Sequence, residues 1–505
     1  MIRSGTGCVT TQEYPVPEET LPQPAPALIW FREDLRLADN PAVSAAVAGG
    51  RPVVCLFVHD EDLPGLRRHG GASKWWLDKS LKALAADIAS LGGTLTIRHG
   101  AAGDVVRQVA EETGAEAVCW NRRYGQAERA LDTQIKEDLK GRGIAVESFN
   151  GRLLMEPWTL KTGSGGYYRV FTPFWKALRA AYRSAPALPR PKSLKGPKVD
   201  GLPVGALGLH PVSPDWSGGM AACWTPGEAG AAAQLKAFLS GAVSQYADRR
   251  NLPGVDQSTS GLSPYLRFGE IAPAQVWRAV MAAIEAGRID EASAMVFLSE
   301  IAWREFSYVL LFHNPDLATA NYNKDFGHMP WRTGKAALAA WQKGMTGYPI
   351  VDAGMRQLWQ TGWMHNRVRM IVASFLTKHL MIHWRDGEDW FWDTLVDADP
   401  ASNPASWQWT AGSGADAAPY FRVFNPITQG QKFDADGAYV RRWCPELAAL
   451  PDKFLHAPWQ AGAETLKAAG VVLGKTYPKP IVDHDEGRKR ALAAYETLKE
   501  KRSAA

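Results

Sequence analysis

Short apolar runs recur along the first third of the chain and alternate with segments of helical period. The runs are ALIWF, PVVCLFVHD, TLTIRHG, AEAVCWN and IAVESFNG. Between them lie segments such as NPAVSAAVAGG and SKWWLDKSLKALAADIASLGG, which end at glycine as helices commonly do. Fully apolar strands that alternate with such helices predict a parallel sheet covered on both faces. We therefore expect a doubly wound α/β domain over about Ala27–Arg152.

The pattern changes twice after this domain. Residues 153–225 are dense in Pro, Gly and Lys, which predicts a long connector, and GYYRVFTPFWKALRAAYR within it favours a short helix packed on a domain. From residue 226 helical period dominates, as in EASAMVFLSEIAWREFSYVLLFH and NRVRMIVASFLTKHLMIHW. We expect residues 226–505 to form an all-helical domain that ends in a surface helix.

Composition narrows the class of protein. The chain has 505 residues, 46% of them hydrophobic and 22% charged, which is typical of globular domains. Its net charge of +5 permits a basic groove but does not establish one. Five scattered cysteines without metal-ligand spacing, and the lack of an apolar run of 18 residues, predict a cytoplasmic protein without disulfides, structural metal or membrane span. Residues 1–26 predict a disordered leader.

The loop after the first apolar run carries WFREDLRLADN in place of GxGxxG, which disfavours an ordinary dinucleotide site. For Arg32, Asp34, Arg36 and Asp39 we favour a charged loop held by internal ion pairs. Further along, hydroxyl residues precede a helix expected near Pro264, and they are either its N-caps or a phosphate site together with the nearby Arg249 and Arg250. These hydroxyl residues are Thr259, Ser260 and Ser263.

Glu300, Trp303 and Arg304 share one face of an apolar helix, because they are spaced i, i+3 and i+4. One interpretation is a structural Glu–Arg pair. The other is a carboxyl with a raised pKa at the base of a pocket with an aromatic wall.

The stretch Thr361–Asn425 is unusual, and nine of the chain's 21 tryptophans fall between Trp331 and Trp409. An aromatic helical core explains any single one of them. The cluster, lying among polar residues, favours a pocket for a flat electron-accepting cofactor reached by oxidisable rings. Asn366, Arg369 and Met370 share one helix face. We interpret His365 as a hydrogen-bonded structural residue rather than as a catalytic base.

The loop DADPASN leaves several interpretations open. Asp397 and Asp399 suit acid/base work, or a loop that accepts hydrogen bonds from a neutral ligand, and a metal site is weakly supported because no further ligand has suitable spacing. Asn403 adds a neutral donor and acceptor.

The chain closely resembles the photolyase/cryptochrome family in four motifs, GYPIVDAGMRQL, GWMHNRVRM, NPASWQW and DAAPYFRVFNP. The residues of these motifs are most similar to bacterial class III photolyases that repair cyclobutane pyrimidine dimers, which are close to class I. The resemblance implies an N-terminal α/β antenna domain and a C-terminal helical domain that binds FAD. It implies light-dependent DNA repair, in which excited reduced FAD gives an electron to a flipped-out dimer, the ring splits and the electron returns. The alternative is a cryptochrome-type blue-light photoreceptor without repair activity.

The resemblance also assigns residues. The positions that match FAD contacts are Tyr246, Thr259, Ser260, Leu262, Ser263, Arg304, Asn366, Arg369, Asp397, Asp399 and Asn403. Those that match contacts to the dimer are Glu300, Trp303, Asn366, Arg367, Met370 and Trp409. Asn403 matches the position facing flavin N5, where plant cryptochromes carry Asp, and relatives that repair (6-4) photoproducts carry His at the positions of Asn366 and Met370. Trp407, Trp384 and Trp331 match an electron-relay triad.

The remaining expectations concern the antenna and the partners. The family implies a light-harvesting chromophore, for which we favour 5,10-methenyltetrahydrofolate, and Glu128 occupies the pterin-contact position. A Cys-Lys pair that helps to hold folate in some class I enzymes is not evident in NPDLATANYN. UV-damaged DNA is the expected partner of a monomer that needs no metal, membrane or obligate protein partner.

Overall fold

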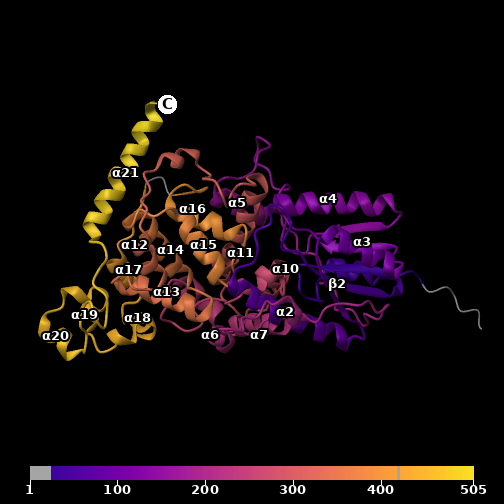
Figure 1. The fold of residues 1–505 in the computed structure, drawn as a ribbon, viewed down its shortest axis with the longest axis horizontal. Helices are drawn as coiled ribbons and strands as arrows, with labels where there is room; N and C mark the ends of the chain where they lie inside the picture. Colours follow the sequence, from indigo (N-terminus) through magenta and orange to yellow (C-terminus); the bar gives the residue numbers. More distant parts are fainter. Residues whose placement is uncertain (1–23, 418–420, 505) are drawn as a thin grey trace, which may run out of the picture.

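Five parallel strands form one sheet in the order β3-β2-β1-β4-β5 in the computed structural model, which describes residues 24–417 and 421–504 (Figure 1). The strands are β1 Ala27–Phe31, β2 Val53–His59, β3 Leu95–His99, β4 Ala117–Asn121 and β5 Ala145–Phe149. This sheet confirms the predicted parallel α/β architecture. The predicted leader lies outside the described residues except for residues 24–26.

Both faces of the sheet are covered, which explains why its strands are apolar at successive positions. Leu28, Trp30 and Val54 face one cluster with helices α3 Ala102–Thr113 and α4 Gln126–Gly141. Alternate strand residues such as Ile29 and Cys55 face the opposite cluster with α1 Pro41–Ala46 and α2 Gly71–Ser90.

The charged loop after β1 is structural, but the prediction that internal ion pairs hold it is wrong. Arg32 pairs with Asp132 at 2.6 Å, and Asp39 pairs with Arg278 of the helical domain. Arg36 donates to the carbonyl oxygens of Asp39, Gly151 and Gly269. The ion pairs therefore reach other elements rather than closing within the loop.

The connector lies against both parts of the molecule. It follows the sheet, since Val53 N donates to Lys195 O at 3.0 Å and Leu202 N donates to Ile97 O at 2.8 Å. Its helix α5, Phe171–Ala181, packs on α11, Glu291–His313, as the pattern predicted. The connector also holds the short helices η2 Val204–Leu207 and α6 Gly218–Cys223.

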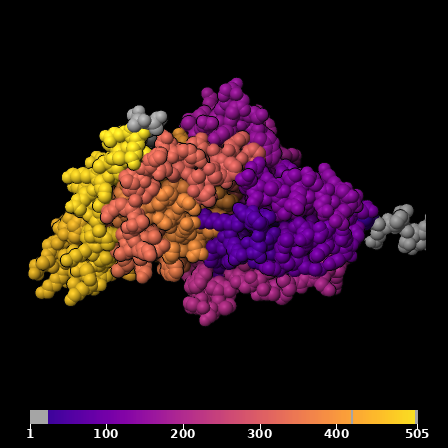
Figure 2. Space-filling view, turned by 45° about the horizontal axis from the view of Figure 1, so that its top comes forward, coloured from indigo at the N-terminus to yellow at the C-terminus, as the bar shows by residue number. Residues whose placement is uncertain are grey.

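The rest of the described chain is helical and forms the end of the molecule opposite the sheet, with the C-terminal residues outermost (Figures 1 and 2). None of the described helices has the length and apolar character needed to cross a membrane. The α-helices besides α11 are α7 Glu228–Leu239, α8 Tyr246–Arg249, α9 Ser263–Phe268, α10 Pro273–Glu285, α12 Lys335–Gln342, α13 Pro349–Thr361, α14 Asn366–Ser374, α15 Trp384–Thr394, α16 Ser402–Ala411, α17 Pro426–Phe433, α18 Ala438–Trp443, α19 Asp452–Leu455, α20 Ala463–Ala468 and α21 His484–Ala504.

One predicted helix is broken. The run NRVRMIVASFLTKHLMIHW was expected to be continuous, but α14 ends at Ser374, a π-helix covers Phe375–His379, and Met381 has a φ of 55°. The π turn buries Lys378, whose Nζ donates to Arg422 O at 2.5 Å and whose pKa burial lowers to about 7. A new helix, α15, then begins with His383 as its N-cap.

Candidate cofactor and substrate site

An Arg–Asp pair links the start of α14 to the loop before α16. Arg369 Nη2 donates to Asp397 Oδ2 at 2.8 Å, and Arg369 Nε donates to Met364 O at 2.7 Å. Asp397 Oδ1 is buried and has no hydrogen-bond partner within the described structure. A buried acceptor without a partner is costly, so this oxygen suits a ligand N–H or O–H group.

Both carboxylate oxygens of Asp399 accept hydrogen bonds from the protein. Its Oδ1 accepts from Ala401 N and Ser402 N, and its Oδ2 accepts from Tyr308 Oη at 2.8 Å. Burial alone would raise the pKa of Asp399, but the nearby cations Arg304 and Arg267, with these hydrogen bonds, lower it overall. The side chain is thus a fixed carboxylate at the beginning of α16.

Asn403 lies in the first turn of α16 and faces a buried acid on α15. Its Nδ2 donates to Glu388 Oε1 at 2.7 Å and to Glu388 O at 3.2 Å. Both amide hydrogens are therefore used, and Oδ1 remains for another partner.

The loop between α8 and α9 carries the hydroxyl residues Thr259 and Ser260. Gln234 Nε2 donates to Ser260 O at 2.8 Å, and Gly261 has a φ of 62°, a left-handed conformation that favours glycine. In the described structure α9 has Leu262 at its N-cap and no side-chain capping bond. The hydroxyls of Thr259 and Ser263 therefore do not cap α9, Ser263 Oγ accepts from Trp363 Nε1 at 3.3 Å, and the phosphate interpretation stays a prediction.

Glu300 differs from its expected environment. It is a quarter exposed and pairs with Arg250 at 2.6 Å, so it is not an isolated buried acid, and its recorded partner is Arg250 rather than Arg304. Arg304 instead donates to Arg152 O at 2.8 Å and pairs with Glu305. The sequence had suggested Arg250 only as a phosphate ligand.

The aromatic members of the expected dimer face are partly exposed. Trp303 stacks on Phe171 of α5 with ring centroids 3.7 Å apart and planes 7° apart. Trp409 and Met370 are half-buried, and Trp409 Nε1 donates to Asp416 O. Asn366 is exposed at the start of α14, and Arg367 donates to Asn251 Oδ1 at 2.8 Å.

Two helices carry both residues expected to contact the cofactor and residues expected to contact the dimer. Glu300 and Trp303 lie on α11. Tyr308, about 12 Å from Glu300 along the axis of the same helix, donates to Asp399. Helix α14 carries Asn366 and Met370 together with Arg369. His365 is its N-cap, and burial together with nearby arginines lowers the pKa of His365 to about 3, as suits a structural residue.

The three relay candidates differ in burial. Trp407 and Trp384 are buried, Trp331 is partly exposed, and His383 contacts both Trp384 and Trp331 through its ring. Trp407 also meets Trp341 with ring centroids 6.1 Å apart. This contact offers a second branch from Trp407.

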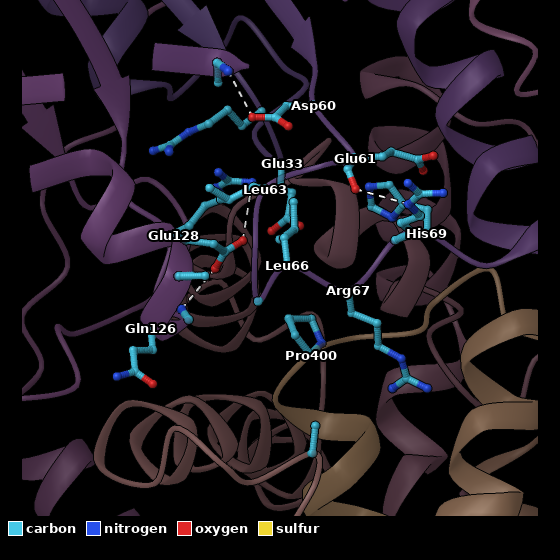
Figure 3. A pocket seen from close by; sticks show the side chains of 18 of the residues that line it. Glu33, Asp60, Glu61, Leu63, Leu66, Arg67, His69, Gln126, Glu128 and Pro400 are labelled. Carbon is cyan, nitrogen blue, oxygen red and sulfur yellow. Dashed lines mark hydrogen bonds and ion pairs between the residues drawn. The ribbon is translucent and has the colours of Figure 1, made fainter. Parts of the chain in front are cut away.

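A separate cavity of about 420 Å³ lies between the α/β domain and the helices (Figure 3). Glu128 lines it, accepts from Gly125 N at 2.9 Å and pairs with Arg123 at 3.3 Å. Among residues 24–417 and 421–504 no group of three or more His, Cys, Asp or Glu is placed to hold a metal.

Sequence reasoning missed residues that complete the site from distant segments. These are Arg67, Phe171, Trp341 and Glu388. Their side chains are ordinary for their local patterns, so only the fold reveals their partners.

Comparisons with known proteins agree with this geometry. Residues 27–192 match the family model "DNA photolyase" and residues 297–497 match "FAD binding domain of DNA photolyase". A deoxyribodipyrimidine photo-lyase of Agrobacterium fabrum is 52% identical over 94% of this chain and 98% of its own length. Cryptochrome-1 of Arabidopsis thaliana is 38% identical over 92% of this chain and 69% of its own.

The fold comparison gives the same relationship. The crystal structure of a bacterial class III photolyase from Agrobacterium tumefaciens superposes with a TM-score of 0.92 at 50% identity, covering 96% of this chain and 100% of that one. The orphaned Asp397 Oδ1 and the uncapped hydroxyl loop fit an FAD site in the helical domain. The chain therefore belongs to the photolyase/cryptochrome family and carries the FAD-binding domain of a DNA photolyase.

Proposed function

We propose that this chain is a deoxyribodipyrimidine photo-lyase that repairs cyclobutane pyrimidine dimers in DNA under light. The observation that supports the proposal is that α11 and α14 each hold residues expected to contact the cofactor and residues expected to contact the dimer. With these roles, an electron donor and its acceptor would share one rigid support. The relatives named as photo-lyases, at up to 52% identity, support the same activity.

The residues of the chain bind and orient the two reactants. Reduced FAD, when bound and excited by light, supplies the electron that opens the cyclobutane ring. A base that reacts must leave the helix, at a cost of about a few kcal/mol that is lower for a damaged pair. Trp303 and Trp409 present apolar faces to the extruded bases. Glu300 holds Arg250 beside them, and a fixed cation there stabilises negative charge that develops on the dimer.

The test is a repair assay on the purified, flavin-reduced protein. Under blue light it should restore intact pyrimidines in an oligonucleotide that carries one cyclobutane dimer, with no restoration in the dark. An oligonucleotide with a (6-4) photoproduct should stay unrepaired. Failure to repair the cyclobutane substrate would refute the repair activity and favour the alternative, a cryptochrome-type photoreceptor. The 38% identity to Arabidopsis cryptochrome-1 supports that alternative.

We propose methenyltetrahydrofolate as the antenna, and the 420 Å³ cavity beside Glu128 is one place for it. A second place is the pair Trp359 and Trp390, whose rings are parallel within 6° at 5.8 Å and of which Trp359 is 64% exposed. Flat heteroaromatic ligands stack on such rings. Loss of folate absorbance from Glu128→Ala would support the cavity, and loss from Trp359→Ala would support the tryptophan pair.

The proposed working state is a cytoplasmic monomer. The four described cysteines are free thiols, which supports a reducing compartment. Sedimentation of the FAD-loaded protein would measure its mass.

A further inference from the structure

The segment before α2 joins the α/β domain to α15 through close contacts. Trp392 Nε1 donates to Arg68 O at 2.8 Å, and Gly71 N donates to Asp393 Oδ1 at 2.8 Å. A Cβ at Gly70 would lie 2.2 Å from Trp392 O, so only glycine allows this approach. The side chains that this segment presents to α15 are therefore held in place.

Arg67 lies on this segment at the edge of the cavity (Figure 3). It pairs with a buried acid, Glu388 of α15. Its Nη1 donates to Glu388 Oε1 at 2.7 Å and Oε2 at 2.8 Å, and its guanidinium lies 4.3 Å from the centroid of the Trp392 ring. Its Nη2 pairs with Asp389. The Glu388 side chain is only 1% exposed, so Arg67 is the cation that compensates a carboxylate taken out of water.

Glu388 in turn determines how Asn403 is oriented. Two acceptors of Glu388, Oε1 and the backbone oxygen, receive the Asn403 amide hydrogens. The opposite amide orientation would set Oδ1 against both oxygens, which is repulsive. A charged Glu388 therefore keeps Oδ1 of Asn403 turned to the other side.

We propose that Arg67 is a positioning residue for the flavin, acting across the domain boundary through Glu388 and Asn403. The inference rests on the proposed position of Asn403 at flavin N5. Reduced flavin carries a hydrogen on N5, which suits the Asn403 oxygen, whereas oxidised N5 is an acceptor and suits the amide hydrogens.

Loss of Arg67 should lower the midpoint potential of the flavin whether Glu388 stays charged or becomes protonated. An uncompensated Glu388 carboxylate disfavours adding an electron nearby, and a protonated Glu388 lets the amide turn its hydrogens to N5. Both routes favour oxidised flavin. Arg67→Ala should therefore shift the midpoint potential of the bound flavin to a more negative value, measured by titration in the dark without DNA.

Matched variants separate charge from docking. Arg67→Lys keeps the cation and should stay close to the unmodified protein, and so should Asp393→Ala, which removes a contact of the same segment but no cation. The double variant Arg67→Ala with Glu388→Gln separates the two routes. It should return most of the shift where a lone Glu388 carboxylate causes it, and keep the shift where a turned Asn403 amide causes it, because a neutral glutamine at this position allows that turn as protonated Glu388 does. Where Arg67→Ala does not retain flavin, Arg67→Gln should show the negative shift.

Three results would overturn the inference. An unchanged potential in Arg67→Ala, with a shifted potential in Asn403→Ala, refutes the role of Arg67 alone. Unchanged potentials in both refute the inference together with the proposed position of Asn403. An equal shift in Asp393→Ala would assign the effect to domain docking instead of charge.

Discussion

Glu300 and Trp303 stand one helical turn apart on α11, and each is fixed by a residue from another segment. Arg250 holds the carboxyl of Glu300, and Phe171 covers one face of Trp303. The exposed quarter of Glu300 and the partly exposed Trp303 ring are thus pre-set before any substrate arrives. Pre-set groups lower the ordering cost of binding.

Replacement of Glu300 tests this arrangement. Glu300→Ala removes one hydrogen-bonding group and leaves Arg250 without its carboxylate, so repair per absorbed photon should fall about fivefold, as a loss near 1 kcal/mol implies. Glu300→Gln, which keeps the hydrogen-bonding shape, should lose less. Bound FAD absorbance should be unchanged in both. Equal repair by Glu300→Ala and the unmodified protein would remove Glu300 from the substrate site.

Replacement of Trp407 separates light-driven reduction of the flavin from repair. Trp407→Phe should abolish photoreduction of oxidised flavin, because a phenylalanine ring is much harder to oxidise, while protein reduced in advance still repairs DNA. Trp341→Phe should give a partial loss if the 6.1 Å contact with Trp407 is a working branch. Trp277→Phe, on α10, is the control and should leave photoreduction intact. Rapid photoreduction in Trp407→Phe would contradict the relay.

At the scale of elements, α15 and α16 pack closely because glycine occupies one contact. A Cβ at Gly387 would lie 2.2 Å from Trp407 Cη2 and 2.6 Å from Leu376 Cδ2. The Trp407 ring can therefore lie against the α15 backbone. The packing that positions Trp407 therefore depends on glycine, which has no side chain, at position 387.

Gly387→Ala should destabilise the protein despite the better helix propensity of alanine. Overpacking costs about 1–3 kcal/mol, against a gain of about 1 kcal/mol for Ala over Gly in a helix. Denaturant unfolding should show a net loss of stability and a disturbed Trp407 environment. Gly141→Ala at the end of α4, where a Cβ meets nothing within 4 Å, is the control and should be neutral or stabilising by up to about 1 kcal/mol, because it gains helix propensity without overpacking. A higher free energy of unfolding in Gly387→Ala would contradict the prediction, because it would mean that the Trp407 ring shifts to accommodate the added methyl group at little cost.

The elements differ in how far local sequence determines them. The strands were predictable because they are short runs bounded by turn residues, and β1, β2 and β4 are apolar and buried at every position, whereas the edge strand β5 is exposed or half-buried throughout. The break near Met381 was not predictable, since no Gly or Pro marks it in the sequence, and the buried Lys378 in the π turn bonds to the distant Arg422 O. Likewise, helical spacing placed Glu300 beside Trp303, but no local pattern distinguishes Arg250 as the partner from Arg304.

At the scale of the whole molecule, buried polar groups join the domains. Glu270 is fully buried and accepts from Trp76 Nε1 at 3.2 Å and from Gly227 N at 2.6 Å. Glu33 pairs with Arg267 at 2.7 Å across the same boundary. Burial raises the pKa of Glu270 to about 8.

This raised pKa predicts a pH dependence of stability. Between pH 4.5 and about 8 the folded protein keeps a proton on Glu270 that the unfolded chain has released, so the free energy of unfolding falls as pH rises, by at most about 1.4 kcal/mol per unit from this group. Glu270→Gln should make that fall shallower, although its amide costs stability overall beside two donors. Denaturant unfolding at several pH values measures the slope. The exposed control Glu285→Gln should keep the full slope, and an unchanged slope in Glu270→Gln would refute the assignment.

The stack between Phe171 and Trp303 means that the connector forms one wall of the proposed substrate face. Residues 153–225 therefore do not behave as an exchangeable spacer. A chimaera that grafts the helical domain of a relative onto this α/β domain would join a foreign Trp303 equivalent to a resident Phe171 and lose their fit. Recombination between relatives is expected to succeed when the breakpoint lies before α5, so that connector helix and catalytic domain are inherited together.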